Sequence, residues 1–235
     1  LKEIYEQPEV FAYATSSFVN FKQQKIEMLN DFNEFDHIDR IIFVACGTAF
    51  YACAVAKYWF EKYVKVPVEI DVASEFRYRD TSFSKNEYAI FVSQSGETAD
   101  TLAALRKVKG KVKKTISIVN VIESSIARES DFILPIKAGP EIGVASTKAF
   151  TSQLAVLACL TIYFSDRRGL LSKKEISELV NALVSIPSIM SNILSKTKDY
   201  KGFAKKLMKS NNALFLGRGI LYPLALEAAL KLKEI

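Results

Sequence analysis

The chain has 235 residues, of which 49% are hydrophobic, and this is enough for one large or two small domains with a buried core. Its 32 basic and 26 acidic side chains give a formal net charge of +6. Because the basic residues are dispersed and no aromatic-interleaved basic motif occurs, we expect no nucleic-acid partner.

Residues 1–35 alternate loosely between apolar and charged positions and include Pro8, which suggests an N-terminal helical arm. No charged-then-apolar leader opens the chain, so secretion is not expected. The only histidine, His37, follows in a polar stretch before an apolar run, where we expect it to lie at the surface. Acid–base chemistry is therefore expected from carboxylates and lysines.

Five short apolar runs follow, and their nearly continuous hydrophobicity is typical of strands buried on both faces. They span residues 41–45, 66–70, 88–92, 115–119 and 132–136. Between these runs, residues 49–63 and 98–108 have apolar side chains at helical spacing, and shorter helices are expected at 73–79 and 124–128. This alternation predicts a three-layer α/β/α sandwich with a five-stranded parallel sheet of flavodoxin- or Rossmann-like topology, plus helical extensions.

Two further segments in this half need an interpretation. The densest basic run, residues 107–114, lies between periodic segments, which favours a solvated loop over a patch that binds polyanions. The longest apolar tract, residues 149–164, is broken by polar side chains and falls short of the roughly 20 residues that a membrane span needs. We predict a buried helix there and no membrane partner.

The last 65 residues have a different organisation. Residues 172–194 are helical in period, with Pro187 marking a break. Residues 213–216 are a further strand candidate, followed by a helix from Leu221 onward. Offset by 172 positions, Gly47 matches Gly219, so this looks like the opening of a second copy of the first strand–helix unit. Its apolar surface has no sheet of its own, so it should pack against the first domain or against a second copy of the chain. We therefore expect a homodimer.

The cysteines and the single histidine limit the cofactor chemistry. The three cysteines, Cys46, Cys53 and Cys159, contain no C-x-x-C pair, and with one histidine a zinc site has too few ligands. We expect no metal and no organic cofactor. Cys46 and Cys159 lie in apolar surroundings, which favours structural thiols in a reducing, cytoplasmic compartment.

Residues 93–98 read SQSGET and follow the third predicted strand, where a helix begins. The first N–H groups of a helix are unpaired and its dipole attracts anions, and Gly96 lets the backbone approach a ligand closely. Hydroxyls and an amide that can bind phosphate come from Ser93, Gln94, Ser95 and Thr98. An N-cap by Ser95 explains the pattern equally well. No lysine-containing phosphate loop or G-x-G-x-x-G motif occurs, so nucleotide sites are not expected.

Three charged residues near the end of the chain, Glu227, Lys231 and Glu234, are separated by four and three positions and so share one helix face. Two carboxylates that flank an ammonium can tune each other's pKa, as a general base for enolisation requires. The residues alone favour an ordinary solvent-facing row of ion pairs.

Five motifs then decide between these alternatives. In chain order they are CGT at 46–48, ASEFRYR at 73–79, SQSGETADT at 93–101, EIGVASTKAF at 141–150 and LEAALKLKEI at 226–235. With the opening residues 2–8, they resemble the isomerase half of the glutamine–fructose-6-phosphate aminotransferase family, which consists of two sugar isomerase (SIS) domains. The resemblance implies an arm at 1–35, a first SIS domain at 36–170, a helical linker at 171–204 and an incomplete second SIS domain at 205–235.

The same resemblance implies roles for particular residues. The residues implied to bind the sugar phosphate are Thr48, Ser93, Gln94, Ser95 and Thr98, and those implied to line the sugar end are Val144 and Ser146. Ala49 stands where the family commonly has a serine. Glu234 matches the catalytic carboxylate that moves a proton between C1 and C2, and Lys231 and Glu227 match the active-site lysine and its neighbouring glutamate.

The implied function is conversion of fructose 6-phosphate, with glutamine-derived ammonia, to glucosamine 6-phosphate in the hexosamine pathway that leads to UDP-GlcNAc. In the full-length enzymes of the family a glutaminase domain supplies the ammonia. We expect this chain to be an excised or incomplete isomerase segment that binds hexose phosphate but turns over poorly alone. The alternatives are a non-catalytic sugar-phosphate sensor and a structural subunit.

Overall fold

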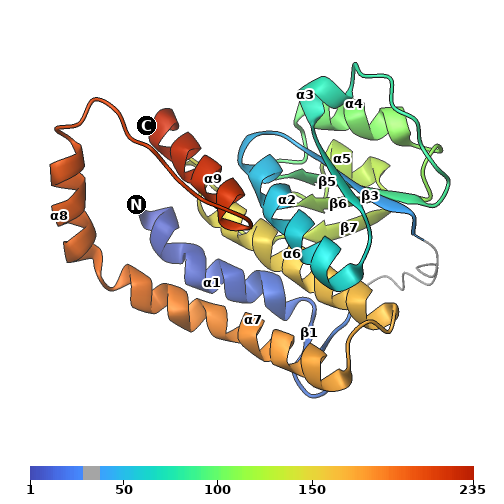
Figure 1. The fold of residues 1–235 in the computed structure, drawn as a ribbon, viewed down its shortest axis with the longest axis horizontal. Coiled ribbons are helices and arrows are strands. Elements are labelled where there is room, and N and C mark those ends of the chain that lie inside the picture. The colour runs from blue at the N-terminus through green and yellow to red at the C-terminus, as the bar shows by residue number, and fades with distance from the viewer. Residues whose placement is uncertain (29–37) are drawn as a thin grey trace.

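A five-stranded parallel sheet forms the centre of the molecule. In this computed structural model, residues 1–28 and 38–235 are described, apart from the side chains of residues 198 and 199. The strands are β3 (Arg40–Ala45), β4 (Val68–Val72), β5 (Glu87–Ser93), β6 (Lys114–Val119) and β7 (Phe132–Pro135). They pair in parallel in the order β4-β3-β5-β6-β7 (Figure 1). The predicted sheet is therefore confirmed, with the 2-1-3-4-5 order of a flavodoxin-like fold.

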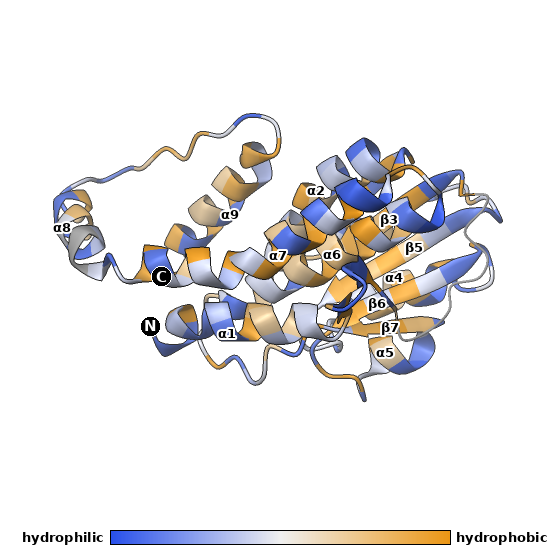
Figure 2. Ribbon diagram, turned by 90° about the horizontal axis from the view of Figure 1, so that it is seen from below, coloured by the Kyte–Doolittle hydropathy of each residue, from blue (hydrophilic) through white to orange (hydrophobic). Residues whose placement is uncertain are grey.

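Both faces of this sheet are buried, which explains why its strands lack a polar alternation. Every residue of β5 is buried, and the strands are coloured largely as hydrophobic in Figure 2. Successive side chains point to opposite faces. Phe43 and Ile90 therefore join one core cluster, whereas Ile42 and Phe91 join the other.

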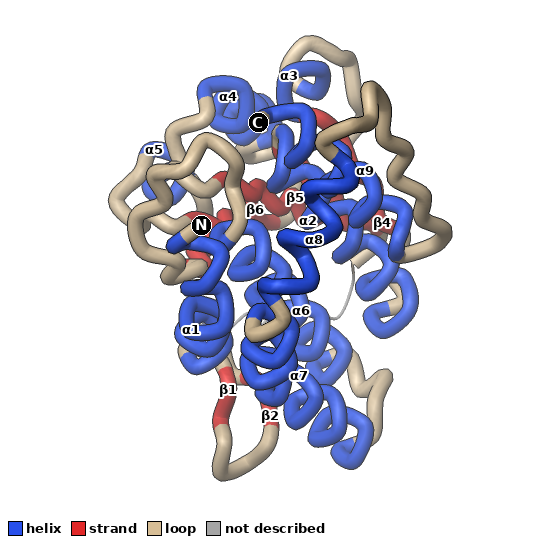
Figure 3. The backbone as a smooth tube through the Cα atoms, turned by 90° about the vertical axis from the view of Figure 1, so that its left-hand side faces the viewer, coloured by secondary structure: helices blue, strands red, loops and turns tan. Residues whose placement is uncertain are grey.

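Helices cover the two faces and complete a three-layer sandwich, which Figure 3 shows with the strands between the helical layers. On one face lie α3 (Ala73–Phe76), α4 (Ala99–Val108) and α5 (Ser125–Glu129). On the other lie α2 (Gly47–Trp59), its π-helical continuation η1 (Phe60–Val64) and α6 (Lys148–Arg167). The rings of Phe43 and Phe60 meet edge to face at 5.4 Å between centroids, which ties β3 to this second layer.

In the described part of the N-terminal arm, residues 1–28, the helix ends at Ser16. Helix α1 (Lys2–Ser16) is followed by a short antiparallel pair, β1 (Val19–Asn20) and β2 (Lys25–Ile26). Phe11 and Ala14 of α1 are buried in the same core cluster as α6, so the arm packs as part of the sandwich. The predicted end of the arm, residues 29–35, and the predicted surface residue His37 lie outside the described residues.

After α6 come three helices, and here two expectations prove wrong. Helix α7 (Lys173–Leu194) runs through Pro187 without a break. Its apolar stripe, including Ile176 and Val180, is buried, and this packing outweighs the hydrogen bond that a proline removes. Residues 213–216 form no strand, and they pair with none of the described strands.

The other two helices come before and after this irregular segment in the chain. Helix α8 (Thr197–Leu207) lies away from the sheet (Figure 1). Helix α9 (Leu221–Glu234) begins at the predicted position and packs against α2. The division of the chain into two SIS units stays a prediction.

Among the described helices, α6 and α7 are long and apolar enough to cross a membrane by length and composition. In α6, 72% of the apolar window is buried inside the fold, so the predicted buried helix is confirmed. In α7 the buried share is 17%, because one stripe of this helix packs and the rest faces outward. The expectation of no membrane partner stays a prediction.

Candidate functional site

The carboxyl ends of β3 and β5 meet at the point where the strand order of the sheet reverses. Chains leave neighbouring strands in opposite directions at such a point, and open α/β sheets bind ligands in the crevice that results. A cavity of about 210 Å³ lies here. It is lined by Cys46, Thr48, Ala49, Val92, Ser93, Gln94, Ser95, Thr98, Thr101, Ser146 and Gln153.

The loop after β5 is folded by its own hydroxyl groups. Ser93 Oγ accepts a hydrogen bond from the Gly96 N–H at 3.1 Å and shares one with Thr98 Oγ1 at 3.0 Å. Ser95 Oγ accepts from the Glu97 N–H at 3.2 Å. Helix α4 begins only at Ala99, and no side chain caps it. The hypothesis that Ser95 caps this helix is therefore wrong, and the uncapped helix start faces the cavity side of the loop.

Gly96 is required by the geometry of this loop. Its φ of +67° lies in the left-handed region, which side chains disfavour. A Cβ there would stand 1.9 Å from the Oγ of Ser124, which belongs to the loop after β6. The loops after β5 and β6 are therefore in direct contact at this glycine.

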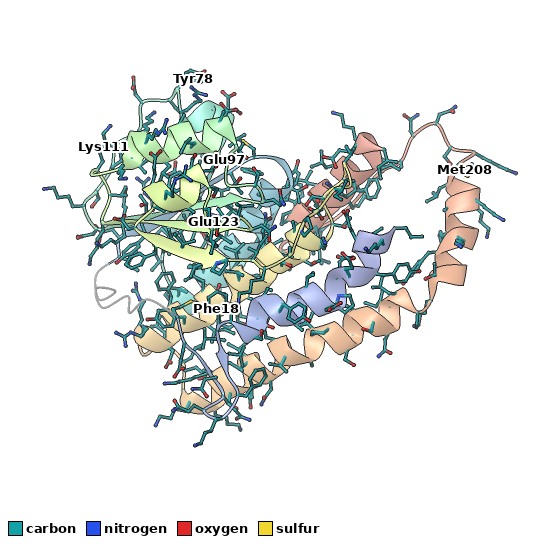
Figure 4. The ribbon with its side chains drawn as sticks, turned by 180° about the vertical axis from the view of Figure 1, so that it is seen from behind. Phe18, Tyr78, Glu97, Lys111, Glu123 and Met208 are labelled. Atoms are coloured by element: carbon teal, nitrogen blue, oxygen red, sulfur yellow. The ribbon has the colours of Figure 1, made fainter. Side chains whose placement is uncertain are left out.

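Glu97 makes a second link between these two loops and does not line the cavity. Its Oε1 accepts a hydrogen bond from the Ser125 N–H at 2.7 Å, at the start of α5. That hydrogen bond holds the pKa of Glu97 below its ordinary value. Figure 4 labels Glu97 and, close by, Glu123, which immediately precedes Ser124. Glu97 therefore supports the loop and is not placed to act on a ligand.

The opposite wall of the cavity joins helix α2 to helix α9. Thr48, in the first turn of α2, donates its hydroxyl to Glu227 Oε1 at 3.1 Å. The same hydroxyl oxygen accepts from Lys231 Nζ at 2.9 Å. Both partners are on α9, so Thr48 connects the cavity to the charged face of the last helix.

Glu227, Lys231 and Glu234 of α9 lie on one face, as their spacing predicts. Lys231 Nζ is 3.4 Å from Glu227 Oε1 and 2.6 Å from Glu234 Oε2. The side chain of Glu227 is only 7% exposed, so a solvent-facing row of ion pairs does not describe it. Burial raises the pKa of Glu227, although the Lys231 ammonium and the Thr48 hydrogen bond oppose that shift. Glu234, at 29% exposure, is the more accessible carboxylate.

The structure brings most of the predicted phosphate-binding residues together. Those that line the cavity are Thr48, Ser93, Gln94, Ser95, Thr98 and Ser146. Val144 does not line it and is 88% exposed. The α9 residues border the cavity through Thr48 rather than lining it.

Sequence reasoning missed two polar residues in the cavity wall. Thr101 and Gln153 are almost fully buried. Thr101 Oγ1 and Gln153 Oε1 have no hydrogen-bond partner among the described residues, and buried polar atoms of this kind normally have one. Two signals were available: Thr101 lies one turn beyond Thr98, and Gln153 interrupts the apolar tract at 149–164.

The cavity wall is polar but carries no lysine or arginine among its lining residues. Hydroxyls, an amide and the uncapped helix start are the groups that would hold an anion. Fold and cavity together define a flavodoxin-like α/β protein with a hydroxyl-lined cavity at the switch point of its sheet. The chain belongs to the SIS domain family, whose model matches residues 34–163.

Known proteins resemble the whole chain. It is 53% identical, over all 235 residues, to glutamine–fructose-6-phosphate aminotransferase (isomerizing) of Bradyrhizobium diazoefficiens, and it spans 39% of that relative's length. The solved C-terminal domain of glucosamine-fructose-6-phosphate aminotransferase from Francisella tularensis is 42% identical with a TM-score of 0.96, and the match covers 100% of this chain and 66% of that one. Glucosamine-6-phosphate deaminase of Thermotoga maritima matches at 25% identity and a TM-score of 0.66, covering 98% and 65%.

Proposed function

We propose that the cavity binds the phosphate group of fructose 6-phosphate, and that this chain supplies the isomerase part of its conversion to glucosamine 6-phosphate. The observation that supports this most directly is the hydroxyl-rich loop from Ser93 to Thr98 at the switch point of the sheet. The 53% identity to a glutamine–fructose-6-phosphate aminotransferase supports the choice of sugar.

The phosphate is held by the loop after β5. Ser95 and Thr98 line the cavity and bring hydroxyls to it, and the free N–H groups at the start of α4 add donors. Each hydrogen bond to a charged phosphate contributes about 1.5–3 kcal/mol. Thr48 adds a hydroxyl from the opposite wall, and the helix dipole supplies the positive potential that the side chains of the wall lack.

The sugar carbons extend from the phosphate toward α9, where the proton transfer takes place. Ketose-to-aldose isomerisation moves a proton between adjacent carbons, which needs a base that accepts it and returns it. Glu234 has that role, because it is the accessible carboxylate beside Lys231. Glu227 is held by Thr48 and positions the lysine. Lys231 stabilises negative charge that develops on the substrate oxygen.

The whole reaction needs components beyond this chain's own residues. Its relatives are named as glutamine-dependent enzymes, and the chain spans 39% of their length. We propose that a glutaminase domain supplies ammonia, that the protein acts in the cytoplasm, and that it forms a homodimer. The exposed apolar side chains of Leu214 and Leu216, at 87% and 88% exposure, support such an association. We expect low turnover from the 235 residues alone.

A non-catalytic sugar-phosphate sensor is the alternative function. It is favoured by one feature, which is that the loop after β5 and the charged residues of α9 are on separate elements. A sensor needs the former and not the latter. Glu234→Gln therefore distinguishes an enzyme from a sensor. In both cases the affinity for fructose 6-phosphate should stay the same. Only an enzyme should lose the exchange of substrate C1 or C2 hydrogens with D₂O.

Calorimetric titration of the chain with fructose 6-phosphate, glucose 6-phosphate and glucosamine 6-phosphate tests the binding proposal. We expect Ser95→Ala to weaken the affinity about tenfold, because one hydrogen bond to a charged group is lost. Ser185→Ala, on the exposed face of α7, is the matched control and should change nothing. If the wild-type chain binds none of the three sugars, or if Ser95→Ala binds them as tightly as the wild type does, the proposal is wrong.

A further inference from the structure

The loop at residues 139–147, between β7 and α6, brings Ser146 to the cavity. Inside this loop, Glu141 Oε2 accepts a hydrogen bond from the Ser146 hydroxyl at 2.8 Å, and Glu141 Oε1 accepts from the Thr147 N–H at 2.8 Å. The direction of the Ser146 side chain therefore depends on how the loop as a whole is held.

Helix α1 holds the tip of this loop through one carboxylate. Glu3 Oε1 accepts hydrogen bonds from the N–H groups of Ile142 at 2.6 Å and Gly143 at 3.1 Å. A carboxylate that accepts two backbone N–H groups forms charge-assisted hydrogen bonds, which are stronger than neutral ones. Because the tip is otherwise exposed, Glu3 fixes a segment that has few packing contacts of its own.

Gly143 shows how closely the carboxylate approaches. A Cβ at this position would stand 2.6 Å from Glu3 Oε2, and the next atoms, Glu3 Cδ and the Ala145 carbonyl oxygen, are 3.6 and 3.8 Å away. The φ of Gly143 is not in the left-handed region. A side chain added here would therefore displace the Glu3 carboxylate, which is the end of a flexible side chain.

A second carboxylate of α1 holds the point where the loop enters α6. Glu6 Oε2 is 2.7 Å from Lys148 Nζ, and the Lys148 side chain is only 6% exposed. A buried ammonium requires a partner, because removing one member of a buried pair leaves an uncompensated charge. Glu3 and Glu6 are one helical turn apart, so both contacts come from one face of α1.

We propose that Glu3 and Glu6 are positioning residues that hold the 139–147 loop so that Ser146 faces the sugar end of the cavity. Neither carboxylate lines the cavity. The inference rests on the proposed function, because it assigns the loop to the sugar and the loop after β5 to the phosphate. Helix α1 is then part of substrate recognition as well as of the core.

NMR-monitored titrations of the chain with fructose 6-phosphate and with inorganic phosphate test this assignment. We expect Glu3→Gln to weaken the affinity for fructose 6-phosphate about tenfold, and to leave that for phosphate within about twofold. Amide exchange at Ile142 and Gly143 should accelerate in the same variant. The control is Glu9→Gln, which makes the same charge change at an exposed position of α1. It should change the affinity for neither ligand.

The two kinds of failure are distinguishable. Equal weakening of both ligands by Glu3→Gln, or unchanged affinity for the sugar, overturns the positioning role while leaving the proposed function in place. A wild-type chain that binds neither ligand overturns the proposed function, and the positioning role with it.

A double-mutant cycle gives an independent measurement. Gly143→Ala should weaken binding of fructose 6-phosphate in the wild-type chain, because the new methyl group displaces the Glu3 carboxylate. In a Glu3→Ala background the same substitution should have no further effect, since the group that the methyl would meet is gone. If Gly143→Ala weakens binding equally in both backgrounds, the coupling is absent and the proposal fails.

Discussion

The ammonium of Lys231 donates a 2.9 Å hydrogen bond to the hydroxyl of Thr48, 183 positions earlier in the chain. The Thr48 hydroxyl in turn donates a 3.1 Å hydrogen bond to Glu227. One hydroxyl is therefore both acceptor and donor between an ammonium and a carboxylate. This contact fixes α9 at the first turn of α2, beside the cavity. It is also where a single substitution should separate the last helix from the rest of the site.

Thr48→Val keeps the shape of this side chain and removes its hydroxyl. Buried Glu227 and largely buried Lys231 then each lose a hydrogen-bond partner, and we expect the free energy of unfolding to fall by about 1–3 kcal/mol. Hydrogen exchange should rise selectively in α9. Thr48→Ser retains the hydroxyl and serves as the control. Uniform exchange across α2, α6 and α9 in the valine variant would contradict the anchoring role.

Glu227→Gln tests the effect of burial on the carboxylate. Burial raises the pKa of Glu227 above its ordinary value of 4.5, so the folded state binds this proton more readily than the unfolded state does. The stability that results is complete below that ordinary value and is lost as the pH rises through the raised pKa. We therefore expect the glutamine variant to gain stability relative to the wild type as the pH increases from about 4 to about 7.

Urea denaturation of both proteins at a series of pH values measures that difference. Glutamine can still accept the hydrogen bond of Thr48, and Lys231 keeps Glu234 as its partner at 2.6 Å. A difference in unfolding free energy that does not change with pH would show that Glu227 has the same proton affinity in both states.

Gly96→Ala should disrupt the loop after β5. The substitution combines a left-handed φ of +67° with a Cβ that would stand 1.9 Å from the Ser124 Oγ. Gly110→Ala is a matched control, because its φ of +77° is similar and nothing lies within 4 Å of the added carbon. The control should lose about 1 kcal/mol of stability and bind phosphate as the wild type does. Gly96→Ala should lose about 2–4 kcal/mol of stability and bind phosphate poorly. Equal losses in both variants would show that the contact with Ser124 is easily relieved.

Ser146→Ala and Val144→Ala form a pair of substitutions in the same loop. Ser146 lines the cavity, whereas Val144 is 88% exposed and does not. We expect the serine variant to weaken binding of fructose 6-phosphate about fivefold to tenfold, and the valine variant to bind within about twofold of wild type. Titration calorimetry on both variants decides the point. Weakening by Val144→Ala would show that the loop closes over the bound sugar.

Local patterns were enough to predict the sheet and the position of the hydroxyl-rich loop after β5. The five apolar runs became the five parallel strands, because strands buried on both faces must be apolar along their whole length. The spacing of Glu227, Lys231 and Glu234 predicted a shared face, since 3.6 residues per turn fix which side chains are neighbours.

The errors arose where a local pattern depended on a distant partner. Residues 213–216 are apolar enough for a strand, but a strand needs an edge with which to pair. Pro187 predicted a break, yet packing of the buried stripe of α7 keeps the helix continuous. Ser95 matched an N-cap, but its hydroxyl accepts from Glu97 instead and the helix begins later.

The sequence by itself determined the parallel sheet, the hydroxyl-rich loop and the family, because these follow from periodicity and from motifs within a few neighbouring residues. Only the tertiary structure decided that Thr48 meets Lys231, that Glu227 is buried, and that Glu3 reaches the 139–147 loop. Those relationships join residues more than a hundred positions apart. They depend on how helices pack onto a sheet, and this packing cannot be predicted from a local pattern of residues.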